Sequence, residues 1–397
     1  MIVPNPRFRP NPARAIYVDG ITDESLLSRL TPAILRLQSN NRDPITVYIV
    51  SSPGGPVAHM QSLLRLLKSS DQDSSSPCDL ITVVTQRAAS AAADLLSSGD
   101  YALAFPDSTI LYHGIRFRET LTAETTSMFA DILRAGNDAY AMELARKIEM
   151  RFLFRFMLSR NDFENVRNQH HPKELSDLEC FLEIVSGQLS EKAKKAFEKA
   201  KQRYGRYESL LRSVIKKEKV NAAVPQRPAE IEAKRLKAIV DFEVSTNRKN
   251  PNWTFKDDGL NRLADDFFLL NEYLESQQNP RFQHWCKGLG RMTLSKEEQE
   301  EIALISDEKA QSERIIDKVR PALEPVWSFF VALCHALQEG ENELTATDAY
   351  WLGLVDEVVG ASLPTSRWWE EYQPDPTPEA QQLDLPGAVV PDPADPT

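Results

Sequence analysis

The chain has 397 residues, and its 47 Lys and Arg against 58 Asp and Glu give a formal net charge of −11. Hydrophobic residues make up 42% and charged residues 26%, which is typical of globular proteins and excludes a wholly disordered chain. The acidic balance argues against nucleic acid as the default partner. No run approaches the roughly eighteen apolar residues of a membrane span, and the proline-broken start lacks the apolar segment of a secretory signal, so we expect a cytoplasmic protein.

The cysteines and histidines predict no metal site. The four cysteines lie too far apart along the chain for a Cys-x-x-Cys pair, and the six histidines show no His-x-x-x-His spacing. Scattered reduced thiols are typical of cytosolic proteins. We therefore expect neither a metal nor another cofactor.

The first third of the chain alternates between strand and helix patterns. The strand patterns are short, apolar and rich in β-branched residues, as in strands buried on both faces of a parallel sheet. The predicted strands are 15–18, 45–50, 80–85, 101–105 and 109–113. The predicted helices, which have apolar residues at helical spacing or are rich in alanine, are about 26–37, 57–67 and 88–98. Repeated β-α-β units predict right-handed crossovers in a layered α/β core.

The middle of the chain is predicted to be helical, with no convincing strand from 161 to 322. One part has apolar residues separated alternately by four and three positions, a heptad pattern that favours one long helix packed against another. These residues are Ala193, Phe197, Ala200, Tyr204, Tyr207, Leu211 and Val214. The pattern fits either a coiled-coil arm or a helix facing the core of a compact helical domain, and we favour the second interpretation.

The end of the chain returns to an apolar helix at 326–339, followed by a closing strand or turn at 350–359. The final residues, 370–397, contain seven prolines and seven acids. Such a segment cannot bury enough apolar surface to order itself. We therefore predict a disordered C-terminal tail.

Three features of the first third could carry chemistry. The turn 52–55 follows a buried strand, and its glycines leave backbone N–H groups free to face a ligand. Ser90 lies among alanines at a strand-to-helix junction, where a helix N-terminus offers N–H groups to an oxyanion. His113 ends a strand and could serve as the base that activates Ser90. Each feature taken alone is more often structural: an ordinary turn, an alanine-rich core helix and a satisfied histidine.

Together, the order and spacing of these features resemble a known family. The segments SSPGG at 51–55 and QRAAS at 86–90, followed by a strand that ends in a histidine, resemble the Clp protease proteolytic subunit of the ClpP/crotonase superfamily. The resemblance resumes at LTATDA, residues 344–349, and at GLVD, residues 353–356. It implies a ClpP/crotonase-like α/β fold and a serine peptidase.

The resemblance also implies roles for single residues. Ser90 matches the nucleophile and His113 the general base, and the backbone N–H groups of Gly55 and Ala91 match the oxyanion hole. An extended substrate would bind by strand addition beside the backbone of Ser52, Pro53 and Gly54.

The acid of the triad departs from the family pattern. Counting back from 344–349, the family's catalytic aspartate falls on Glu341, and a glutamate can orient a histidine in the same way. Glu339 is a neighbouring rival, and Glu341 could instead be a solvated loop acid. Arg87, which precedes the presumed nucleophile where the family has other residues, places a cation beside the site.

The resemblance divides the chain into four parts. Residues 1–160 and 323–366 form the two parts of a ClpP-like core, 161–322 form a mainly α-helical insertion domain between base and acid, and 367–397 form a Pro- and acid-rich disordered tail. The insertion could change ring stacking, cover an entrance or receive a partner. Residues 192–219 within it hold eleven Lys or Arg and three Glu, a net charge of +8.

We favour a ClpP-like serine endopeptidase that acts on peptides or proteins within a homo-oligomeric ring. Members of the family work with separate AAA+ ATPases, so the resemblance implies that this chain has an ATPase partner or another activator. The leading alternative is a catalytically silent ClpP-like scaffold whose insertion binds a partner. A Ser/Lys-dyad hydrolase on the same fold and a crotonase-type acyl-CoA enzyme are weaker, because neither explains Ser90 together with His113. For the basic helix from Lys192 to Lys219, an ion-paired contact is favoured over nucleic-acid binding.

Overall fold

The computed structural model describes five stretches of the chain. They are residues 8–69, 77–116, 123–169, 175–218 and 294–363. The predicted disordered tail at 367–397 and residues 219–293 of the predicted insertion lie outside the described residues.

The central element is a mixed sheet whose main path consists of five parallel strands. In spatial order, these strands are β1 (Ala15–Val18), β2 (Ile45–Ser52), β3 (Leu80–Ala89), β4 (Tyr101–Ala104) and β7 (Glu357–Val358). Strand β5 (Thr109–His113) pairs in parallel with the last residues of β3, and β6 (Glu341–Thr345) pairs with β5 in the antiparallel direction. The predicted α/β class is confirmed, and the long central strands are buried as their apolar sequences require.

Strand β3 runs four residues beyond its predicted end at 85, and the predicted helix at 88 begins instead at Ala91. The reason is pairing, since Arg87 and Ala88 lie opposite both Ser51–Ser52 of β2 and the start of β5. Sheet contacts on two sides outweigh the helix preference of alanine. The extension moves the strand-to-helix junction onto Ser90.

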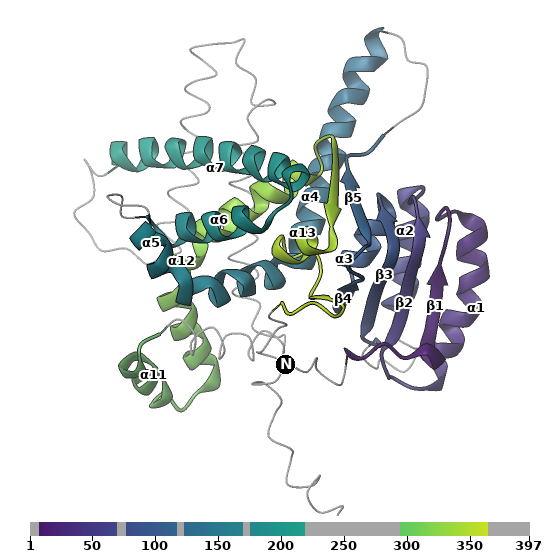
Figure 1. The fold of residues 1–397 in the computed structure, drawn as a ribbon, viewed down its shortest axis with the longest axis horizontal. Coiled ribbons are helices and arrows are strands. Elements are labelled where there is room, and N and C mark those ends of the chain that lie inside the picture. The colour runs from purple at the N-terminus through teal and green to yellow at the C-terminus, as the bar shows by residue number, and fades with distance from the viewer. Residues whose placement is uncertain (1–7, 70–76, 117–122, 170–174, 219–293, 364–397) are drawn as a thin grey trace, which may run out of the picture.

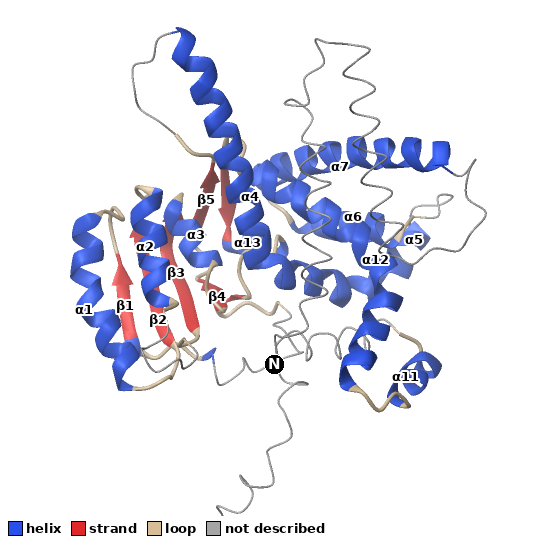
Figure 2. Ribbon diagram, turned by 180° about the vertical axis from the view of Figure 1, so that it is seen from behind, coloured by secondary structure: helices blue, strands red, loops and turns tan. Residues whose placement is uncertain are grey.

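Three helices cover one face of the sheet, the face turned to the viewer in Figure 2. They are α1 (Glu24–Asn40), α2 (Val57–Leu67) and α3 (Ala91–Ser97). Helix α1 begins where the Asp23 side chain accepts a hydrogen bond from the Leu26 N–H, which satisfies one of the free donors of the first turn. Its buried residues Leu26, Leu30 and Ile34 recur at helical spacing, as the sequence predicts.

The remaining described helices pack beside the sheet (Figure 1). They are α4 (Ala123–Ser159), α5 (Phe163–Gln169), α6 (Asp177–Gln188), α7 (Glu191–Glu218), α11 (Lys296–Ala303), α12 (Glu308–Leu337) and α13 (Ala346–Trp351). Helix α12 packs against both α4 and α7. Phe152 of α4 stacks on Phe330 of α12 at a ring-centroid distance of 4.7 Å. No helix of the described residues is long and apolar enough to cross a membrane.

The described helices of the predicted insertion share one hydrophobic cluster with the sheet. In α7, Ala193, Phe197 and Ala200 are buried, and Phe197 meets Phe329 of α12 edge to face at 5.2 Å. Over these residues the heptad pattern is a core-facing seam, the interpretation that we favoured. The side chains at 207, 211 and 214 lie outside the described residues.

The closing segment differs from its prediction. Strand β6 was not predicted, and residues 346–351 form helix α13, whose first turn is capped by reciprocal hydrogen bonds between Thr345 and Asp348. Gly353 then turns the chain with φ +77°, and a Cβ there would lie 2.9 Å from the Phe152 nitrogen. The predicted closing strand is reduced to the two residues of β7.

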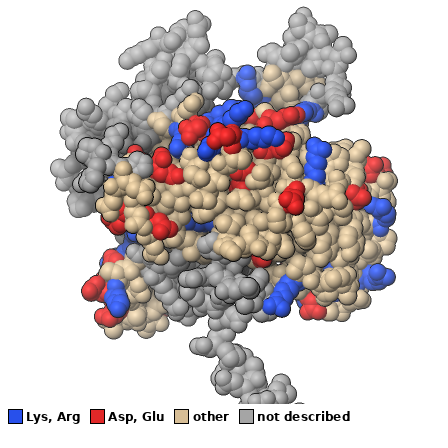
Figure 3. Space-filling model, viewed as in Figure 1, with Lys and Arg blue, Asp and Glu red and all other residues tan. Residues whose placement is uncertain are grey.

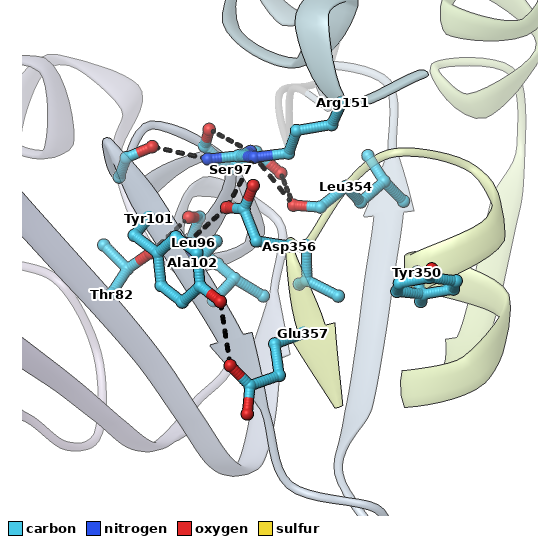
Figure 4. Close-up of polar contacts among 12 residues, drawn as sticks. Thr82, Leu96, Ser97, Tyr101, Ala102, Arg151, Tyr350, Leu354, Asp356 and Glu357 are labelled. Atoms are coloured by element: carbon cyan, nitrogen blue, oxygen red, sulfur yellow. Dashed lines mark hydrogen bonds and ion pairs between the residues drawn. The ribbon is translucent and has the colours of Figure 1, made fainter. Parts of the chain in front are cut away.

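A buried ion pair fixes this closing segment to α4 (Figure 4). Arg151 Nε lies 2.8 Å from Asp356 Oδ2, and both side chains are less than a tenth exposed. The same guanidinium donates to the carbonyls of Ser97 and Gly99, while Asp356 accepts from the Ala102 N–H. Two segments about 200 residues apart in sequence are thereby joined across the insertion.

Candidate active site

Ser90 occupies a sharp turn between β3 and α3. It has φ +55°, and it is the one non-glycine residue with a positive φ in the part of the chain that the structure describes. Its N–H donates to the Leu111 carbonyl of β5 at 2.8 Å, and its carbonyl accepts from the Ala93 N–H at 2.8 Å. A serine in this region is strained, and such strain is held only where surrounding contacts impose it. The side chain is half-buried at the point where strand becomes helix.

The glycine turn lies directly against Ser90. A Cβ on Gly54, which has φ +87°, would stand 2.7 Å from Ser90 Cβ and 2.6 Å from the Ala89 carbonyl oxygen. A Cβ on Gly55 would stand 2.4 Å from the carbonyl oxygen of Thr22. Both positions therefore require glycine, and the absence of side chains lets the turn approach the serine closely.

The segment predicted to bind the substrate, residues 52–54, contains both buried and exposed groups. Ser52 is fully buried, and its hydroxyl donates to the Gly20 carbonyl at 2.7 Å and accepts from the Gly54 N–H at 3.2 Å. Pro53 is exposed. The Ser52 side chain therefore supports the turn from inside the fold, so a substrate could meet this segment only through its backbone and Pro53.

The two N–H groups predicted to form an oxyanion hole belong to Ala91, which follows Ser90, and to Gly55 of the glycine turn. Ala91 is the first residue of α3, so its N–H has no acceptor within the helix. A Cβ on Gly54 would lie 3.0 Å from the Ala91 nitrogen, which shows that the glycine turn and the start of the helix are in contact. Gly55, the next residue of the turn, is half-buried.

His113 is the last residue of β5, the strand that pairs with the end of β3. Its Nδ1 lies 2.6 Å from the Gly114 carbonyl oxygen. A carbonyl oxygen only accepts, so in the neutral imidazole this contact places the proton on Nδ1 and leaves Nε2 as the acceptor, the form required of a general base. The described side chains include no direct hydrogen bond between Ser90 and His113, and such bonds often tighten only when substrate binds.

Glu341 begins β6 and lies directly opposite His113 in the antiparallel register. Its side chain is 64% exposed, and Oε1 lies 2.6 Å from a guanidinium nitrogen of Arg116. The hydrogen bond and charge of Arg116 lower the pKa of Glu341, and His113 adds a smaller lowering. The carboxylate is therefore ionised beside His113, but it contacts Arg116. The rival Glu339 pairs with Arg203 at 2.7 Å.

Two residues near the site, Arg116 and Asp94, were not predicted from the sequence. Arg116 follows the predicted base by three positions, and only the pairing of β5 with β6 reveals its contact with Glu341. Asp94 lies in the first turns of α3, and burial raises its pKa to about 6, an effect that Lys147 partly offsets. Asp94 could have been recognised in the sequence because it follows a run of alanines, ASAAAD, at a position where a buried helix normally has an apolar residue.

The described residues include no group of three or more His, Cys, Asp or Glu side chains that could hold a metal ion. Arg87 is exposed on β3, three residues before Ser90 and opposite Thr109 of β5.

The comparisons with known proteins concern the first third of the chain. The Clp protease family profile matches residues 10–134, a range that contains the glycine turn, Ser90 and His113. The chain therefore contains a region, residues 10–134, that is similar to the Clp protease family. It is 33% identical over 105 residues to the ATP-dependent Clp protease proteolytic subunit of Carsonella ruddii (strain PV), which corresponds to 25% of this chain and 49% of that protein. The chain thus spans about half the length of this curated relative, and Glu341 lies outside the matched residues.

Proposed function

We propose that this ClpP-like protein is a serine endopeptidase in which Ser90 attacks the carbonyl carbon of a peptide bond. The observation that carries the proposal is the junction itself: a serine with a positive φ, in contact with a glycine turn, beside a strand that ends in a histidine. An exposed nucleophile on a strained strand-to-helix turn is a recurring solution in serine hydrolases.

Each of the described groups has its own role in peptide hydrolysis. His113 Nε2 takes the Ser90 hydroxyl proton as the serine attacks and returns it to the leaving amine. The Gly55 and Ala91 N–H groups stabilise the negative charge that develops on the carbonyl oxygen. Glu341, ionised and opposite His113, stabilises the imidazolium that forms. The peptide lies extended along the backbone of residues 52–54.

The matched relative is by its name an ATP-dependent Clp protease proteolytic subunit. By analogy, we expect this chain to form a homo-oligomeric ring with its sites inside and to depend on a separate ATPase or activator that delivers the substrate. We expect the protein to be cytoplasmic.

A catalytically silent scaffold is the second candidate. It is favoured by the contact between Glu341 and Arg116, which engages the acid away from the base. The two candidate functions differ in the role of the Ser90 hydroxyl, because a peptidase needs it as the nucleophile and a scaffold does not need it.

Hydrolysis of fluorogenic peptides and of an unfolded protein separates the two candidates. The full-length protein should cleave them, and Ser90→Ala should lose at least about a thousandfold in kcat/KM because no nucleophile remains. Glu341→Gln should reduce turnover while leaving the oligomer size of the wild type. Equal hydrolysis by Ser90→Ala would exclude the peptidase, while no hydrolysis by either protein in the presence of candidate ATPases would favour the scaffold.

A further inference from the structure

Strand β6, which carries Glu341, is held by helix α7 on both sides of that residue. Arg203 of α7 pairs with Glu339, two positions before Glu341, at 2.7 Å. Lys192 of α7 pairs with Glu343, two positions after it, at 2.8 Å. Two ion pairs from one helix therefore flank the candidate acid along the chain.

A buried contact anchors the start of the same helix to the end of the strand. Asp348 is 1% exposed and accepts hydrogen bonds from the Ser190 N–H and hydroxyl, both at 2.7 Å. It also accepts from the N–H and hydroxyl of Thr345, the last residue of β6. One carboxylate thus joins the residue before α7 to the carboxyl end of the strand.

The position of α7 is in turn fixed by its packing on α12, where Ala193, Phe197 and Ala200 are buried. The strand is fixed from its other side as well, because the Asn342 amide donates to the carbonyls of Ala336 and Leu337 at the end of α12. The strand, α12 and α7 therefore form one packed unit, and a shift of α7 would be transmitted to β6.

Ion pairs also neutralise part of the positive charge of α7. Figure 3 shows basic and acidic side chains intermingled on the face where α7 lies. Lys192 and Arg203 pair with acids of the closing core, and Lys201 lies 3.2 Å from Glu198. Lys195 and Lys199 are exposed, and neither pairs with an acid among the residues that the structure describes, which makes them matched controls.

We propose that α7 positions Glu341 by holding β6 through Lys192 and Arg203, so that the helical insertion is coupled to the active site. The proposal rests on the proposed function, in which Glu341 is the triad acid. Lys192 and Arg203 act through Glu341 and touch no reacting atom, so they are positioning residues. A partner that bound α7 and displaced these ion pairs would slow the chemistry without entering the site.

The test is the rate at which a fluorophosphonate probe labels the full-length protein. The double variant Lys192→Gln/Arg203→Gln should be labelled about fivefold more slowly than the wild type, and Glu341→Gln about tenfold or more. Lys195→Gln/Lys199→Gln should match the wild type. Adding the α7 changes to Glu341→Gln should cause no further loss, because residues that act through one group are not additive. Lys192→Arg/Arg203→Lys should restore most of the rate.

The outcomes distinguish this inference from the proposed function. An unlabelled wild type, or a Glu341→Gln protein labelled at the wild-type rate, would overturn the inference together with the triad on which it rests. Slow labelling of Glu341→Gln with wild-type labelling of the α7 variant would overturn the inference alone. A further loss when the changes are combined would mean that α7 acts by general stability, which also contradicts the proposal, and thermal melting of all variants measures that contribution.

Discussion

At the scale of single residues, the close contact between the glycine turn and Ser90 depends on the backbone conformation of both. The turn can touch the serine because Gly54 carries no side chain, and the serine keeps its positive φ because sheet and helix contacts hold it on both sides. The sequence identified the residues of this junction from their order, but the direct contact falls on Gly54, while Gly55 faces Thr22. Local patterns cannot distinguish two adjacent glycines that meet different neighbours.

Gly54→Ala should therefore disrupt the junction. Its Cβ would overlap Ser90 Cβ and the Ala89 carbonyl, and φ +87° is itself unfavourable for alanine. We expect labelling of Ser90 to fall by at least about tenfold and unfolding free energy to fall by about 1–3 kcal/mol. Gly187→Ala, in α6 with open space around the added Cβ, is the control and should be neutral or stabilising. Equal behaviour of the two variants in labelling and urea unfolding would contradict the contact.

Asp94 predicts a pH-dependent stability. Burial raises its pKa from an ordinary value of 3.8 to about 6. A carboxyl whose pKa is higher in the folded state binds more protons there, so stability falls as the pH rises between these two values. Asp94→Asn should be more stable than the wild type at pH 8, by about 1–3 kcal/mol, and lose that advantage near pH 4. Urea unfolding at both pH values measures this, and a gain that is the same at both would exclude Asp94 as the cause.

At the scale of elements, the patterns that were predicted well are those decided by local spacing. The parallel strands and helices of the first third, and the core-facing seam of α7, follow from the apolar residues of each segment. Strand β6 was missed because its sequence, ENELT, has three polar residues on its exposed face and only Asn342 and Leu344 buried. Its partner β5 lies more than 220 residues earlier, and no local pattern records such a pairing.

The closing segment depends on a charge pair rather than on its own propensity. Arg151→Met would leave the Asp356 carboxylate buried without its cation, and we expect a loss of about 3–5 kcal/mol in unfolding free energy. Changing Asp356→Asn in the same chain should recover part of that loss. Lys194→Gln, which removes an exposed pair with Glu191, should leave the urea midpoint unchanged. A small effect of Arg151→Met would mean that the segment is held by packing alone.

At the scale of the whole molecule, the described helices between His113 and Glu341 pack on the sheet. Because they share one hydrophobic cluster with the sheet, the boundary predicted at residue 161 does not mark a separate core. The net charge of −11 gave no indication of this arrangement, in which basic residues of α7 pair with acids next to Glu341. The order of the segments could be read from the sequence, while their contacts required the structure.

In the proposed function, Ser90 is a nucleophile that His113 activates. Fluorophosphonate labelling of the full-length protein, followed by mass spectrometry of the labelled peptide, tests it most directly. We expect one modified residue, Ser90, with no label on Ser90→Ala and strongly reduced label on His113→Ala. Labelling that persists in Ser90→Ala, or a wild-type protein that stays unlabelled with candidate ATPases present, would contradict it.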